Sequence, residues 1–231
     1  ADSGIIGPYE LKGKRVMYSK GADDATFFAM FHQLGINESD FEHVAPSFDA
    51  GSLIRGETDA IASYLTNQPY YYKEKGYDIH IINPINFGVD FYDDILFTSE
   101  KSVRDNPERT LKFLEASMKG WRYALENKDE VIGWLDSKYP SEISHNYLQF
   151  EAEETEKMIL PNMVDIGHMS SERFHRIADI YKQQGLVDED ASYSGVTLGE
   201  YLYTQDALPF WAKFVFAVAG GSLLLTIFLV G

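Results

Sequence analysis

The sequence contains no cysteine. This absence excludes disulfide frameworks, thiolate nucleophiles, and zinc or iron–sulfur sites with cysteine ligands. Basic residues are also scarce, because 20 lysines and arginines stand against 36 aspartates and glutamates, for a formal net charge of −16 over 231 residues. Phosphate binding needs a concentrated basic surface, so this charge argues against a nucleic-acid partner. The hydrophobic share of 45% is that of a globular chain with one or two domains.

Motifs of catalysis and of metal binding are absent as well. The six histidines show neither the HExxH nor the HxH spacing of metal ligands. No GxSxG, P-loop or GxGxxG motif indicates acyl transfer, phosphate binding or a dinucleotide. The adjacent carboxylates Asp23-Asp24 and Asp93-Asp94 could in principle do acid–base chemistry, but helix capping is the simpler explanation. We therefore expect no catalytic residue, no metal and no cofactor.

The C-terminal stretch is long and apolar. Residues 214–231 carry no charge, and at about 1.5 Å per residue they would span roughly 27 Å, close to the thickness of a bilayer core. Leu208–Ala212 extends the run backwards, with Pro209 suited to a first helical turn. The pattern predicts a transmembrane helix over 208–231, with a buried core helix as the alternative. Gly220-Gly221 would allow two such helices to approach closely, which makes a homodimer through this helix a further hypothesis.

Because the sequence ends within this run and begins without a signal peptide, we expect it to be a piece of a longer protein.

Residues 14–83 alternate β-type runs with helical ones. Strands are predicted at Lys14–Tyr18, Phe41–Ala45, Asp59–Tyr64 and Asp78–Asn83. The helical runs between them cover residues 25–34, Asp49–Arg55 and Asn67–Lys75, and each is followed by a glycine. Repeated strand–helix–strand units predict an α/β fold with a mostly parallel sheet and helices on both of its faces.

The pattern changes after residue 83. One more strand is predicted at Ile95–Thr98, and helices follow at Glu108–Glu126, Lys128–Lys138, Ser144–Leu160, Ser171–Gln184 and Leu198–Tyr203. An apolar stripe on the first of these helices favours core packing over a cofactor box, and it consists of Leu111, Leu114, Met118, Trp121 and Leu125.

Polar side chains follow the predicted strands, where open α/β sheets bind their ligands. The segments are 19–24 after the first strand, 64–69 after the third, and 90–92 after a glycine-containing connection. Each combines rings or hydroxyls with a few polar groups, as a small-molecule pocket requires. Residues 46–49 are a weaker candidate, better explained by a turn and a helix cap.

Seven segments in a fixed order resemble a known family. They are ELKGKRV (10–16), LGI (34–36), SFD (47–49), GETDA (56–60), YLTNQP (64–69), GVDFYDDILFTSE (88–100) and NPERTLKFLEASMKGWRYAL (106–125). Over roughly residues 8–187 the chain resembles substrate-binding proteins of the sulfonate/taurine and thiamine-pyrimidine-precursor type, above all the copies used as sensor domains in bacterial membrane signalling proteins.

The resemblance implies a type II periplasmic-binding-protein fold with two lobes that close on a ligand. Residues 1–207 would be the extracytoplasmic ligand-binding domain, with 10–83 as the second lobe and 84–207 as the hinge and the helical part of the first. The family's opening strands have no counterpart here, so the first lobe would be incomplete. Pyrimidine synthases of this fold carry a cysteine-rich motif that this chain lacks, so their activity is not implied.

The resemblance also implies which residues face the ligand. Residues after the first and third strands would form hydrogen bonds with the ligand, and two tyrosines would stack on it. Carboxylates would provide charge complementarity towards a neutral or cationic heteroaromatic ligand. These candidates are Ser19, Asp23, Tyr64, Thr66, Asn67, Asp90 and Tyr92.

Together these features predict a non-enzymatic, extracytoplasmic small-molecule sensor domain in the bacterial inner membrane. Residues 1–207 would lie in the periplasm, and lobe closure would act through the helix at 208–231 on a cytoplasmic output module. The alternative is a membrane-anchored solute-binding component of an ABC transporter for a small sulfonate or heteroaromatic nutrient. A third reading, an enzyme that uses the same cleft, has no nucleophile–base pair to support it.

Overall fold

The computed structural model describes residues 3–21, 24–47, 49–139 and 143–204. The chain divides into two compact units, the first reaching His168 and the second starting at Met169. Within the described residues, no helix is both long and apolar enough to cross a membrane. The membrane helix predicted over 208–231 lies outside the described residues, and the lobe boundaries predicted at 83 and 207 stay predictions.

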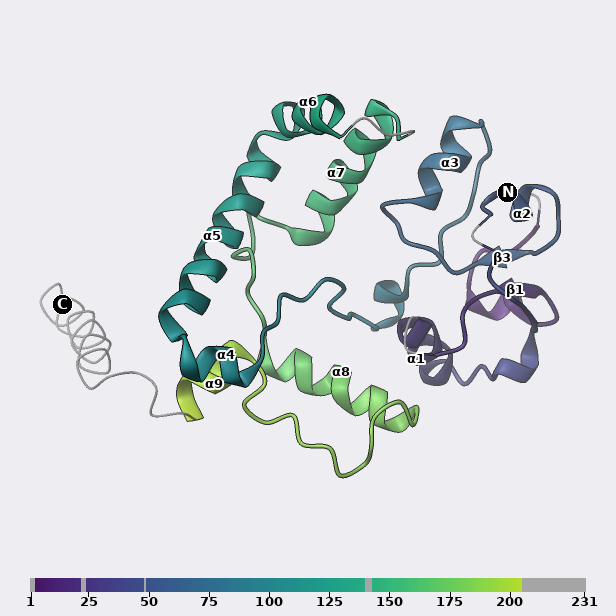
Figure 1. Ribbon diagram of the computed structural model, residues 1–231. Coiled ribbons are helices and arrows are strands. Elements are labelled where there is room, and N and C mark those ends of the chain that lie inside the picture. The colour runs from purple at the N-terminus through teal and green to yellow at the C-terminus, as the bar shows by residue number, and fades with distance from the viewer. Residues whose placement is uncertain (1–2, 22–23, 48, 140–142, 205–231) are drawn as a thin grey trace, which may run out of the picture. The chain divides into compact units, whose positions relative to one another are not determined.

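A three-stranded parallel sheet organises the first part of the chain (Figure 1). Its strands are β1 (Arg15–Met17), β2 (Glu42–Val44) and β3 (Ala60–Ile61), in the spatial order β2-β1-β3. The three predicted strands and their parallel pairing are thus confirmed. The residues Val16, Met17 and Tyr18 along the central strand are all buried, as expected for a parallel strand covered on both faces.

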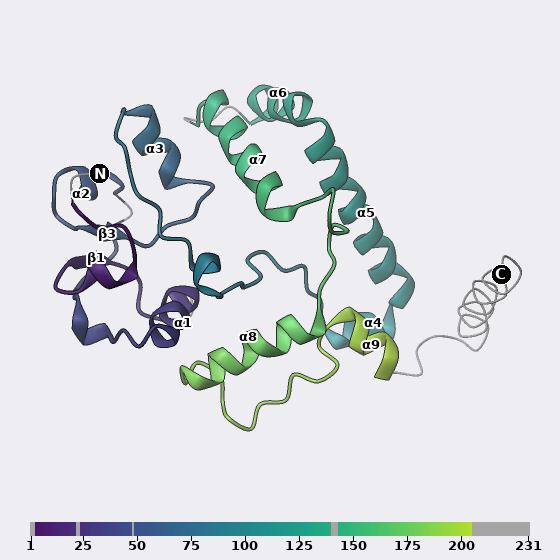
Figure 2. The same cartoon turned by 180° about the vertical axis from the view of Figure 1, so that it is seen from behind.

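Helices follow each strand in the predicted order. They are α1 (Ala25–Gln33), α2 (Gly51–Ile54) and α3 (Gln68–Glu74), with short 3-10 helices η1 (Pro8–Leu11) and η3 (Glu38–Asp40) beside them. Figures 1 and 2 show α1 on one side of the strands and α2 and α3 on the other. The backbone after α1 turns left-handed at Gly35, with φ of 69°, a conformation that glycine adopts without steric cost.

Aromatic packing between α1 and the sheet forms the core of this α/β part. The ring of Tyr18 contacts Phe28 at 5.4 Å and Phe41 at 5.9 Å between centroids, and Phe27 contacts Phe31 at 4.2 Å. Such ring pairs contribute about 0.5–1.5 kcal/mol each beyond the burial of their area. The core therefore fixes the end of β1, where the first candidate ligand residues follow.

Two predicted strands are wrong. Residues 78–83 and 95–98 are irregular, and the 3-10 helix η4 (Pro84–Phe87) begins directly after the first of them. A strand forms only where a neighbour pairs with its backbone groups, and among the described residues the sheet ends with β2 and β3. Phe97 is 87% exposed, so the second segment also lacks the packed surface that β-type residues require.

A helical part completes the first unit. It contains α4 (Glu100–Asp105), α5 (Pro107–Glu126), α6 (Lys128–Lys138) and α7 (His145–Ile159), of which only α4 was not predicted. Lys128 joins α6 to both neighbouring helices, because its Nζ donates to Leu125 O at 3.0 Å and to Glu156 Oε2 at 2.7 Å.

The apolar stripe on α5 departs from the predicted core packing. Leu125 is buried, whereas Leu111 is 51% and Trp121 is 44% exposed. Both α4 and α6 contact α5, yet these two side chains of the stripe remain about half exposed.

The described residues of the second unit form two helices, α8 (Ser171–Gln183) and α9 (Leu198–Thr204), both close to their predicted bounds. Ser170 caps α8, its Oγ accepting a hydrogen bond from Arg173 N at 3.3 Å.

Candidate functional site

The three strands end at the same level of the sheet. Met17 lies opposite Val44 and Ile61, and two further bonds extend the pairing, Tyr18 N to Val44 O at 3.3 Å and Ala62 N to Met17 O at 2.9 Å. The segments that follow the strands therefore start from one edge. This is the carboxyl edge, where open parallel sheets bind ligands.

Ser19 follows β1 on a firmly held backbone. Tyr18 O accepts a hydrogen bond from His43 Nε2 at 3.0 Å, and the two rings lie 4.5 Å apart. Burial raises the pKa of Tyr18 to about 12, so its phenol stays protonated at neutral pH. The hydroxyl of Ser19 is half-buried and has no hydrogen-bond partner among the described residues, which leaves it available to a ligand. Asp23 lies outside the described residues.

The turn after β3 presents a ring and a free amide. Tyr64 is 60% exposed, and its backbone N donates to Gln68 Oε1 at 3.2 Å. Asn67 occupies the N-cap position of α3, yet its side chain makes no capping hydrogen bond. An N-cap asparagine usually accepts such a bond, which is worth about 0.5–2 kcal/mol. The exposed Asn67 amide is therefore free to bind something else, with the half-buried Thr66 beside it.

Asp90 and Tyr92 belong to a separate segment. Gln33 Nε2, at the C-terminal end of α1, donates to Phe87 O at 2.8 Å, and Val89 N donates to Pro84 O at 3.1 Å. This contact lies at the end of α1 away from Ser19. Asp90 and Tyr92 are half-buried and engaged in interactions of their own. Their membership of a common site with Ser19 and Asn67 stays a prediction.

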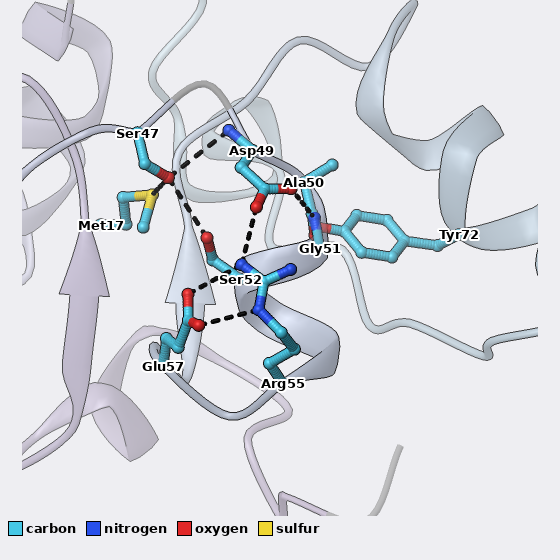
Figure 3. A network of polar contacts seen from close by, with 9 residues as sticks. All are labelled: Met17, Ser47, Asp49, Ala50, Gly51, Ser52, Arg55, Glu57 and Tyr72. Atoms are coloured by element: carbon cyan, nitrogen blue, oxygen red, sulfur yellow. Dashed lines mark hydrogen bonds and ion pairs between the residues drawn. The ribbon is translucent and has the colours of Figure 1, made fainter.

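A network of polar contacts connects α2 with the segment that follows β2 (Figure 3). Ser47 Oγ lies 3.2 Å from Ser52 Oγ and 3.8 Å from the sulfur of Met17. Asp49 Oδ1 accepts from Gly51 N at 2.8 Å, which holds the turn that leads into α2, while the N-cap residue Ala50 makes no side-chain cap bond. Tyr72 donates to Ala50 O at 2.8 Å and so attaches α3 to the start of α2.

Arg55 is a member of this network that the sequence did not single out. Its Nη2 lies 2.6 Å from Asp49 Oδ2, and its Nε lies 2.8 Å from Glu57 Oε1. The guanidinium lowers the pKa of Asp49 and of Glu57, chiefly by hydrogen bonding. The guanidinium of Arg55 is already paired with the carboxylates of Asp49 and Glu57. The network therefore stabilises the loops on either side of α2, and Arg55 is not available to an anionic ligand.

Among the described residues, no group of three histidine, aspartate or glutamate side chains lies close enough together to hold a metal ion.

Comparison with known proteins decides the family. Residues 1–131, more than half of the 231, match the family model described as NMT1/THI5 like. The chain belongs to the NMT1/THI5-like family. The predicted resemblance is thereby confirmed. The match spans the sheet, α1 to α5 and the start of α6, and includes every candidate ligand residue of this NMT1/THI5-like chain.

A curated relative is the formylaminopyrimidine-binding protein of Halalkalibacterium halodurans. It is 29% identical over an alignment of 162 residues, and the match covers 65% of this chain and 48% of the relative. The NMT1/THI5-like chain thus spans about half the length of this relative.

Proposed function

We propose that this chain binds a small organic molecule at the carboxyl edge of its sheet and does no chemistry on it. The observation that carries the proposal is a pair of polar side chains without hydrogen-bond partners among the described residues, Ser19 and Asn67, on the segments that follow two adjacent parallel strands. Membership of the NMT1/THI5-like family supports it.

The ligand class follows from the groups at that edge. The exposed ring of Tyr64 suits stacking on a flat heteroaromatic, worth about 0.5–1.5 kcal/mol. The amide of Asn67 and the hydroxyl of Ser19 both donate and accept, as recognition of ring nitrogens or an exocyclic amine requires. A net charge of −16 disfavours an anion. The name of the relative points the same way, so the proposed ligand is a neutral or cationic aminopyrimidine-like molecule.

The proposed architecture is a two-lobed clamp of periplasmic-binding-protein type II. Residues 10–83 would form one lobe, and residues 84–207 the hinge and the helical part of the other. Closure on a ligand requires that the closed state bind it more tightly than the open state does. The loops after β1 and β3 would contribute one wall of the cleft.

The proposed role is that of an extracytoplasmic sensor domain, tethered to the bacterial inner membrane by residues 208–231. The uncharged run at 214–231 supports the tether. A solute-binding component of a transporter is the second candidate, favoured by the relative's name as a binding protein. Loss of uptake on removal of a permease partner would favour the second candidate over the first.

Calorimetric titration of the full chain in detergent micelles with formylaminopyrimidine tests the proposal. We expect measurable binding, and we expect Asn67→Ala to raise Kd about three- to tenfold, since one hydrogen bond contributes about 0.5–1.5 kcal/mol. Ser19→Ala should act similarly.

Asn162→Ala is the matched control, because it truncates an exposed asparagine in the turn after α7, outside the segments that follow the strands. If Asn67→Ala and Ser19→Ala bind as tightly as the control does, the proposed site is wrong.

A further inference from the structure

A chain of polar contacts joins α8 to α9 in the second unit. Ser171 Oγ lies 2.8 Å from Thr197 Oγ1, and Thr197 Oγ1 donates to Glu200 Oε2 at 3.1 Å. The other carboxylate oxygen, Glu200 Oε1, lies 2.7 Å from His175 Nε2, an ion pair when the imidazole is protonated and one without the geometry of a hydrogen bond. Ser171 and His175 are four residues apart, so they share one face of α8. These four residues form what we call the α8–α9 clasp.

The hydrogen bonds of the clasp allow only one assignment of donors and acceptors. The Thr197 hydroxyl has one hydrogen, which goes to Glu200, so Ser171 must donate to Thr197. Thr197 Oγ1 also accepts from Glu200 N at 3.3 Å, which caps the start of α9. Thr197 is only 1% exposed, so water cannot readily replace a partner that this hydroxyl loses.

Tyr193 and Lys182 hold the connecting loop to α8 as well. Lys182 Nζ donates to Glu189 O at 3.0 Å and to Ala191 O at 2.7 Å, and lies 4.7 Å from the centre of the Tyr193 ring. The Tyr193 hydroxyl donates to Asp179, and its ring lies 5.3 Å from that of His175. The loop between α8 and α9 is therefore attached to α8 before the chain enters α9.

Fully buried apolar side chains are absent from the part of this unit that the structure describes. Leu198 at the start of α9 is exposed. With seven residues, α9 is too short to be stable as an isolated helix in water. Its helical state must therefore come from contacts, and those described for residues 198–201 of α9 include the clasp.

We propose that the clasp makes α8 and α9 move as one body, so that a displacement of α8 passes to the chain that follows Thr204. Breaking the clasp from either helix would release α9. The inference concerns the second unit alone, and it stands whether or not the first unit binds a ligand.

Hydrogen–deuterium exchange of the full chain in micelles tests this proposal. We expect His175→Ala, a change on α8, to speed amide exchange at least tenfold at residues 200 and 201 of α9, whose backbone amides donate to Thr197. Glu200→Ala should do the same. The double variant should exchange no faster than the faster single variant, because both changes remove one shared contact.

Controls separate the clasp from general damage. Glu189→Ala removes an exposed carboxylate from the same loop, and Gln183→Ala truncates an exposed side chain at the end of α8. Neither should alter exchange in α9 by more than twofold. If His175→Ala and Glu200→Ala also stay within twofold of the wild type, or if their effects multiply in the double variant, the proposal is wrong.

Variants that unfold the unit would exchange quickly in α8 as well. In that case, two milder substitutions at Thr197 provide the test. Thr197→Val keeps the shape of the side chain but removes the hydroxyl, whereas Thr197→Ser keeps the hydroxyl. Faster exchange in α9 for valine but not for serine supports the clasp. Equal exchange in the two variants overturns it.

Discussion

Asn67 and Arg55 show why single side chains near the sheet edge differ in what they can do. Arg55 has two carboxylates within hydrogen-bond distance, so its charge is already used inside the protein. Asn67 occupies a capping position without capping, so its hydrogen-bonding capacity is unused. An unused polar group at a strand end is the better candidate for ligand contact, because a ligand gains its bonds without first breaking others.

Arg15 and Asp59 give a test at the scale of one ion pair. Arg15 Nη2 and Nε lie 2.9 and 3.1 Å from the two oxygens of Asp59, and Arg15 N donates to the same carboxylate at 2.9 Å. The Arg15 hydrogen bond holds the pKa of Asp59 below its usual range. A depressed pKa stabilises the folded state above the unfolded pKa, near 4, and this stabilisation disappears as pH falls through the folded pKa.

We therefore expect Asp59→Asn to lower the free energy of unfolding by about 1 kcal/mol at pH 7, because the pair is partly exposed. The difference from the wild type should shrink below pH 4. Urea unfolding at pH 7 and pH 3 measures it. Asp165→Asn, at an exposed position of the same unit, should change stability little at either pH. A difference that is the same at both pH values would contradict the ion-pair explanation.

At the scale of elements, periodicity predicted helices well and strands only in part. A helix bonds within its own segment, so the 3.6-residue pattern of residues 107–159 suffices to place α5, α6 and α7. A strand bonds to a neighbour, and residues 78–83 have the composition of a strand without a partner among the described residues. Arg55 was missed for the same reason, since its importance depends on which residues the fold brings beside it.

One signal for the clasp was present in the sequence. Thr197 and Glu200 have the T-x-x-E spacing of a capping box, which marks the start of a helix and the residues that hold it. The partners Ser171 and His175 come from another helix, and no local pattern reports them.

The contact between α3 and α7 gives a test at the scale of two elements. The ring of Tyr70 lies 5.4 Å from that of Tyr147 and 5.5 Å from that of Phe150, and its hydroxyl lies 3.4 Å from Ser144 Oγ. Lys73 Nζ lies 5.8 Å from the centre of the Phe150 ring. These side chains connect the α/β part of the first unit to its helical part.

We expect Tyr70→Ala and Phe150→Ala to be coupled by about 0.5–1.5 kcal/mol in a double-mutant cycle of urea unfolding. The pair Tyr70→Ala and Trp134→Ala should be additive, because Trp134 contacts Tyr139 at 5.5 Å and not the α3 side chains. Additivity of the first pair would show that the ring contact does not hold the two parts together.

At the scale of the whole molecule, a strongly acidic body and an uncharged tail belong to one chain. The acidic side chains total 36, and none of them lies in residues 214–231. Charge repulsion from anionic lipid would keep the acidic body off a membrane surface. A tail without charge has the opposite preference, so the proposed function assigns membrane attachment to this segment alone.

Deletion of residues 208–231 separates these two contributions. We expect the full chain to float with anionic lipid vesicles in a density gradient and the deleted chain to stay in solution, because the net charge of −17 that remains after loss of one lysine is repelled. The segment removed contains one lysine and no acidic residue, so the body keeps its whole acidic excess. The deleted chain should also keep its affinity for formylaminopyrimidine, because every proposed ligand contact lies before residue 93. Flotation of the deleted chain would place the membrane contact in the body, and loss of affinity would make the segment part of the folded binding unit.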